Sequence, residues 1–154
     1  MKSRKNYILS LLIVTTLASI GISASETFAV AIPVNTKAVL THPALPGPII
    51  VAGTANINVT GTTVDPGYFH MTGPSSAKVI IDWSPGTVSS TGRFAVRGSA
   101  RAKFKDPATG LPVYIFFKVK TKGRTDSVAR AMGRFGDYAT STPGAHLRRG
   151  KYHH

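Results

Sequence analysis

The stretch RFAVRGSARAKFK, residues 93–105, alternates small or apolar side chains with basic ones. Phe94, Val96 and Phe104 occupy one set of alternating positions. The other set contains five basic residues and no acidic one: Arg93, Arg97, Arg101, Lys103 and Lys105. Because successive side chains of a strand point to opposite faces, this period of two predicts a β-strand with one buried face and one cationic face.

A second alternating stretch, VYIFFKVKTKG at residues 113–123, follows the turn-forming sequence DPATGLP. The two stretches predict an antiparallel hairpin with its loop at residues 106–112. Tyr114 and Phe116 fall among the outward basic positions, where an aromatic ring can stack on a sugar or a base. We call the eight basic side chains of this outer surface the cationic hairpin face: Arg93, Arg97, Arg101, Lys103, Lys105, Lys118, Lys120 and Lys122.

Short alternating stretches and turn signals continue upstream of the hairpin, at the intervals typical of all-β folds. Strands are expected near residues 49–61, 67–73 and 77–83. The turn sequences DPG and GPSS bracket the second of them, and SPG follows the third. Apolar residues do not follow a helical spacing anywhere in this region. The sequence therefore predicts an antiparallel all-β domain over residues 49–123.

The segments on either side of this region have weaker patterns. Residues 30–48 contain four prolines, which predicts an extended lead-in with at most short edge strands. Residues 124–154 form a basic, glycine-containing tail, in which residues 126–139 suggest either a final strand or a short helix. The last part of the tail has little to bury, so we expect it to be disordered.

The first 29 residues have the order of a secretory signal peptide: a basic start, an apolar run and then small residues. Cleavage is expected after Ala24 or Ala29, and the alternative is an uncleaved membrane anchor. Export places the protein in the periplasm, at the cell surface or in the medium. Removing residues 1–29 leaves 16 basic and five acidic residues, a net charge of +11.

This positive charge indicates the class of partner rather than the fold. It favours anionic envelope polymers or lipids, such as lipopolysaccharide and acidic glycans, and export makes nucleic acid an unexpected physiological partner. The alternative interpretation of the cationic hairpin face is a solvated surface that discourages edge-to-edge aggregation. The chain has no cysteine, which excludes disulfides, cysteine zinc sites and thiol catalysis.

The sequence gives little support for an enzyme. It contains no G-x-S-x-G, H-E-x-x-H or S-x-x-K motif and no phosphate-binding glycine loop. Asp65 and Asp106 each precede a proline, which favours a role in turns. His70 and Asp82 on neighbouring strands are the weakly supported candidates for acid–base chemistry, as in a hydrolase. We predict no catalytic, metal or cofactor site.

The segment AGTANINVTGTTVDPGYFHMTGPSSAKVIIDW, residues 52–83, resembles a family of small exported bacterial proteins called domain of unknown function 4402. The similar features are the Gly-Thr that opens a strand, the FHMTG strand, the alternating strand at 78–83 and the ATG…Y run before IFFKVK. The resemblance covers roughly residues 49–120. It implies an Ig-like β-sandwich, in some members reminiscent of fimbrial subunits, and it carries no catalytic residues.

Together these observations predict a structural or adhesive component of the bacterial envelope or surface. Such a protein can also self-associate by strand addition at an exposed sheet edge. The alternative is a secreted cationic effector that acts on anionic membranes.

Overall fold

The computed structural model describes residues 28–126 and 128–154, and this part of the chain forms strands and turns with no helix. Ten strands follow one another along the sequence. They are β1 (Ala29–Thr41), β2 (Ile49–Thr60), β3 (Thr63–Val64), β4 (Gly67–Gly73), β5 (Ala77–Trp83), β6 (Gly86–Thr87), β7 (Arg93–Lys105), β8 (Pro112–Thr125), β9 (Ala131–Thr140) and β10 (His146–His153).

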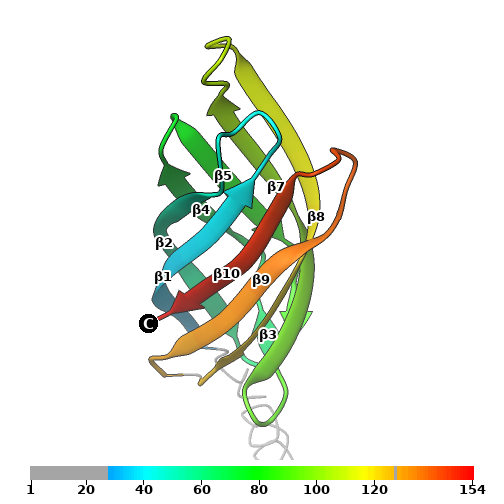
Figure 1. The fold of residues 1–154 in the computed structure, drawn as a ribbon. Helices are drawn as coiled ribbons and strands as arrows, with labels where there is room; N and C mark the ends of the chain where they lie inside the picture. Colours follow the sequence, from blue (N-terminus) through cyan, green and yellow to red (C-terminus); the bar gives the residue numbers. More distant parts are fainter. Residues whose placement is uncertain (1–27, 127) are drawn as a thin grey trace, which may run out of the picture.

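The strands form one antiparallel sheet that closes into a barrel of eight strands (Figure 1). The strand order is β1-β10-β9-β8-β7-β5-β4-β2, and β1 also pairs with β2 along twelve residue pairs, which closes the ring. The prediction of an antiparallel all-β fold is confirmed, but the sheet is not divided into the two layers of a sandwich. Closure pairs both edges of the eight-stranded wall, and the two-residue strand β6 is left at an edge of the sheet.

Two proline-containing bends divide strands that would otherwise be continuous. Pro66 separates β3 from β4, and Pro85 separates β5 from β6. Because proline has no backbone N–H to donate, it interrupts a hydrogen-bonded ladder. The short strands β3 and β6 pair with each other beside β2, whereas β4 and β5 pair in the barrel wall.

Apolar side chains fill the interior of the barrel. Phe69 lies at its centre, with ring centroids 4.7 Å from Trp83 and 5.2 Å from both Phe135 and Tyr152. The Trp83 indole donates a hydrogen bond to the Asp65 carbonyl at 2.9 Å. An eight-stranded barrel has an interior about wide enough for side chains alone, so the alternating apolar residues of every wall strand meet in one core.

The N-terminal segment differs from the expected lead-in, because β1 is a full wall strand of 13 residues. It lies between β2 and β10. Its one proline, Pro33, lies before the segment paired with β10, which begins at Asn35. The other three prolines, at 43, 46 and 48, follow the strand in the connection to β2. Prolines therefore flank the segment paired with β10, whereas Pro33 lies within the segment paired with β2, opposite Asn56.

The last part of the C-terminal segment is not disordered, because it forms β10, and the strand alternative for residues 126–139 is the one found, as β9. These two strands complete the barrel wall. Two irregularities hide their alternation. An extra residue of β9 at Tyr138 shifts the register between Ala139 and Asp137. On β10, Arg149 and Gly150 lie opposite the single residue Ala38 of β1, and Arg149 has a φ of 52°. A β-bulge breaks the period of two on which recognition of a strand depends.

The predicted signal peptide lies outside the described residues, except for Phe28 and Ala29. Ala29, after which cleavage is expected, is the first residue of β1. In the described part of the chain, no helix is long and apolar enough to cross a membrane.

Candidate anion-binding surface

The predicted hairpin is formed by β7 and β8, which pair from Arg93–Arg124 at one end to Lys105–Pro112 at the other. Its inner face contributes Phe94, Val96 and Phe104 to the core, as alternation predicts. All eight residues of the cationic hairpin face are exposed on the outer surface of the barrel. The hairpin extends beyond the other strands at the upper end of the barrel (Figure 1).

Like charges lie directly opposite one another on this surface. Arg97 is paired with Lys120 across β7 and β8, and Lys103 is paired with Lys78 across β7 and β5. Opposed like charges on neighbouring strands destabilise a sheet. Within residues 28–126 and 128–154, only one ion pair offsets this repulsion on the hairpin, between Arg101 and Asp82 at 3.6 Å. Both side chains of that pair are exposed, so its contribution is small.

The acidic residues of the turns accept hydrogen bonds from nearby groups and, in the part of the chain that the structure describes, form no ion pair with the hairpin cations. The Asp65 carboxylate accepts a hydrogen bond from the Thr60 hydroxyl at 2.7 Å, and that of Asp106 accepts one from the Ala108 N–H at 2.8 Å. The Asp126 carboxylate accepts hydrogen bonds from three successive backbone N–H groups, that of Ala129 at 2.9 Å. The Ala129 N–H is the largest cause that holds the pKa of Asp126 below its usual value. The turn role expected for Asp65 and Asp106 agrees with these contacts.

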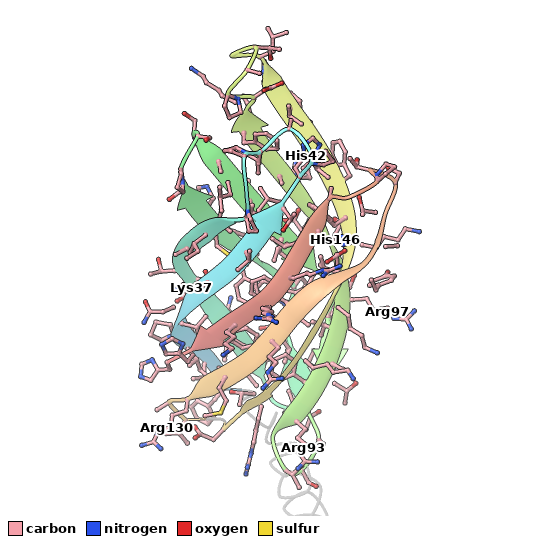
Figure 2. The ribbon with its side chains drawn as sticks, in the orientation of Figure 1. Lys37, His42, Arg93, Arg97, Arg130 and His146 are labelled. Carbon is pink, nitrogen blue, oxygen red and sulfur yellow. The ribbon has the colours of Figure 1, made fainter. Side chains whose placement is uncertain are left out.

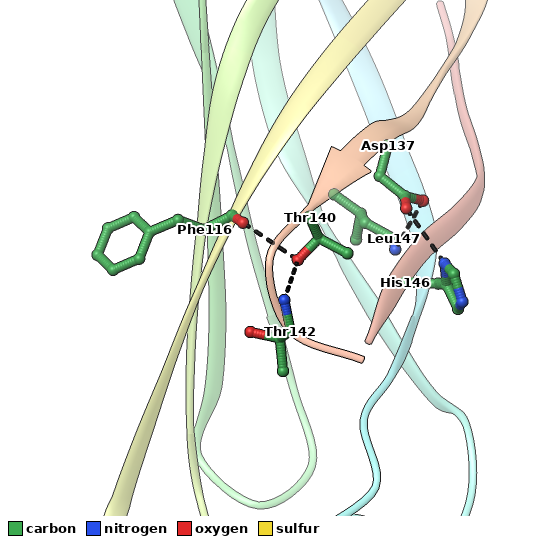
Figure 3. Close-up of polar contacts among 6 residues, drawn as sticks. All are labelled: Phe116, Asp137, Thr140, Thr142, His146 and Leu147. Carbon is green, nitrogen blue, oxygen red and sulfur yellow. Dashed lines mark hydrogen bonds and ion pairs between the residues drawn. The ribbon is translucent and has the colours of Figure 1, made fainter. Parts of the chain in front are cut away.

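Asp137 lies on β9 next to the hairpin, but its side chain faces β10 (Figure 3). The paired segment of β9 and β10 ends at Phe135 and Gly150, and the two strands separate beyond it. The Asp137 carboxylate bridges this gap: it accepts the Leu147 N–H at 3.1 Å and lies 3.2 Å from Nδ1 of His146. The Asp137 carboxylate therefore interacts with groups of β10.

A groove of about 660 Å³ runs along the outer surface over β8 and β9. Gly123 and Gly133 face each other across these strands, and the Tyr152 hydroxyl fills the interior space where a side chain at either position would stand. The charged and exposed aromatic residues that line the groove are five exposed basic residues, one partly buried acid and one exposed tyrosine: Arg93, Lys120, Lys122, Arg124, Arg134, Asp137 and Tyr138.

The cationic surface extends further around the barrel than the sequence predicted. Lys122 of β8 is opposite Arg134 of β9, Arg134 is opposite Lys151 of β10, and Lys151 is opposite Lys37 of β1. We call these four exposed residues the cross-strand row. Alternation within single strands could not reveal the row, because three of its members lie in the segments predicted to be a lead-in and a tail.

The structure does not pair the two acid–base candidates, His70 and Asp82, with each other. His70 and Asp82 lie on the neighbouring strands β4 and β5, but His70 is opposite Ile80, and the Asp82 carboxylate contacts Arg101. His42 packs edge-on against Phe104, and burial lowers its pKa. Among the residues that the structure describes, no group of three or more histidine and acidic residues is placed to hold a metal ion.

Comparison with protein-family models, curated proteins and solved structures gives no significant match.

Proposed function

We propose that this barrel is an exported, non-enzymatic structural or adhesive component of the bacterial envelope or surface. In this role the cationic hairpin face attaches it to anionic polymers, such as lipopolysaccharide or acidic glycans. The observation that carries the proposal is the uniform charge of the outer surface of β7 and β8. A surface that only has to stay hydrated can carry positive or negative charges, whereas a surface that binds polyanions has to be positively charged.

The energetics favour binding over simple solvation. Pairs such as Arg97–Lys120 repel each other in the free protein. A polyanion placed between them supplies the missing counter-charge and releases its condensed counterions, so the binding strengthens as salt is lowered. Of the described acids, only Asp82 forms an ion pair with the hairpin, and the carboxylates of Asp65 and Asp106 are hydrogen-bonded within turns.

The hairpin tip supports a second candidate, action on anionic membranes. Leu111, Tyr114 and Phe116 are 65%, 57% and 61% exposed at or near the end of the hairpin. Lys103 lies beside them, with its ammonium nitrogen 5.3 Å from the centre of the Tyr114 ring. Exposed apolar and aromatic side chains next to lysines suit the boundary between lipid headgroups and acyl chains.

The first experiment measures binding of residues 30–154 to heparin, lipopolysaccharide and anionic vesicles across a salt series. The variant to compare changes Arg97, Lys118, Lys120 and Lys122 to Gln. We expect the wild type to bind with a steep salt dependence, and the variant to bind more weakly with a slope reduced by about 0.7 for each lost contact. Weak and equal binding by both proteins would leave the face as a solubilising surface and overturn the proposal.

Vesicle leakage separates the second candidate from the first. If the hairpin tip inserts into membranes, changing Leu111 and Phe116 to Ser abolishes leakage while heparin binding is retained. Absence of leakage by the wild type contradicts the membrane role and leaves the first proposal intact.

A further inference from the structure

The cross-strand row places four cations on four consecutive strands. Its members, in spatial order, are Lys122, Arg134, Lys151 and Lys37, and each is directly opposite the next. Neighbouring strands lie about 4.8 Å apart, so the row presents positive charges at a regular spacing. All four side chains are exposed, and none forms an ion pair within the described chain.

The row follows the curved wall of the barrel. Following paired residues once around the barrel from Lys122 leads back to β8 at Tyr114, eight residues earlier, so the row rises as it turns. It covers three of the eight steps between strands. In Figure 2, Lys37, at one end of the row, lies on the opposite side of the view from Arg97 of β7, the strand next to that of Lys122. A flat membrane cannot meet both ends of such a row, whereas a thin flexible chain can follow it.

The surroundings of the row favour a saccharide over a nucleic acid. Single-stranded nucleic acids bind where several aromatic side chains accept successive bases beside a basic groove. Here the row contains no aromatic residue, and its groove has one exposed ring, that of Tyr138. A single exposed ring beside a line of cations suits an acidic polysaccharide. One sugar ring of the polysaccharide packs on the tyrosine, and its acidic groups contact the basic residues of the row.

We propose that the cross-strand row is the binding track for a linear acidic polysaccharide, which crosses the strands from β8 to β1. This proposal rests on the proposed function and names its ligand class and its path. Successive sulfate or carboxylate groups of the polysaccharide contact successive members of the row. The groove over β8 and β9 holds the sugar ring next to Lys122 and Arg134.

The test compares two variants that lose the same charge. The row variant changes Lys37, Arg134 and Lys151 to Gln, all three outside the hairpin. The control variant changes Lys78, Arg130 and Arg148 to Gln, which are exposed and lie outside both the row and the cationic hairpin face. Affinities for a heparin oligosaccharide and for an oligosaccharide of polygalacturonate are measured by calorimetry between 50 and 200 mM salt, with thermal unfolding to verify the fold.

We expect the row variant to lose at least about tenfold in affinity at 100 mM salt and the control variant about twofold, because each direct contact releases a counterion. Equal losses, or a larger loss in the control, overturn the track while the proposed function stands. No binding by the wild type overturns both.

A further arm uses single-stranded DNA with the same number of charges. Tighter binding of DNA than of the oligosaccharides, with the same response to the row variant, overturns the saccharide as the ligand. A Tyr138→Ala variant that weakens oligosaccharide binding but leaves DNA binding unchanged supports it.

Discussion

Tyr152 connects three parts of the molecule through one side chain. Its ring is buried against Phe69, and its hydroxyl lies over Gly123 and Gly133 beneath the groove. The hydroxyl donates a hydrogen bond to the Lys122 carbonyl at 3.4 Å. The core, the last strand and the floor of the candidate site therefore depend on the same residue.

Replacing Tyr152 with Ala removes a fully buried aromatic ring from the core. We expect this change to lower the free energy of unfolding by about 3–5 kcal/mol, the usual cost of truncating a buried aromatic side chain. Tyr152→Phe keeps the ring and loses one long hydrogen bond, so it should cost about 1 kcal/mol. Urea unfolding measures both values, and equal costs would contradict the packing role of the ring.

The same residue predicts how stability changes at high pH. Burial raises the pKa of the Tyr152 phenol above its ordinary value. The unfolded chain then releases this proton first as the pH rises past about 10, so the free energy of unfolding falls from that pH upward. Unfolding measured between pH 8 and 11 should show a steeper fall for the wild type than for Tyr152→Phe. Parallel curves would contradict this assignment.

At the scale of elements, the separation of β9 and β10 depends on one carboxylate. Asp137 accepts the Leu147 N–H at 3.1 Å where the strands no longer pair (Figure 3). Asp137→Ala leaves that donor unpaired, at an expected cost of about 1–3 kcal/mol. Asp137→Asn keeps an acceptor oxygen and should cost less.

Hydrogen exchange provides the readout for this pair of variants. The Leu147 amide should exchange faster in Asp137→Ala than in Asp137→Asn, with amides of the β7–β8 hairpin unchanged. A uniform increase across the barrel would show a global loss of stability instead of a local one.

At the scale of the whole molecule, closure depends on β10. This strand pairs with β1 and β9 and buries Leu147 and Tyr152 (Figure 1). Deleting residues 146–154 would leave two unpaired edges and an open core, so we expect the truncated protein to unfold or aggregate. Changing Arg148, Arg149 and Lys151 to Gln removes the same three charges but keeps the strand. Circular dichroism and size-exclusion chromatography should show a folded monomer only for this control.

Prediction from the sequence succeeded where alternation was uninterrupted. The hairpin of β7 and β8 and the strands β4 and β5 follow their apolar patterns closely. Prediction failed at β1 and β10 and left β9 open between a strand and a helix, because prolines, glycines and bulges interrupt the pattern. The two-residue alternation along β7 and β8 was sufficient to predict the eight residues of the cationic hairpin face. Lys37, Arg134 and Lys151 were not predicted to lie on this surface, because no alternating pattern identified their strands.

The sequence by itself determined that the protein is an all-β chain with apolar faces to bury and a large positive charge to display. These properties depend on residues that are close together in the chain, so the alternation of apolar and polar side chains along a strand is enough to predict them. Only the tertiary structure decided that the sheet closes into a barrel and that Lys122, Arg134, Lys151 and Lys37 form one row. Alternation states which face of a strand is buried, but the pairing of β1 with β10 joins residues more than a hundred positions apart, and no local pattern records that contact.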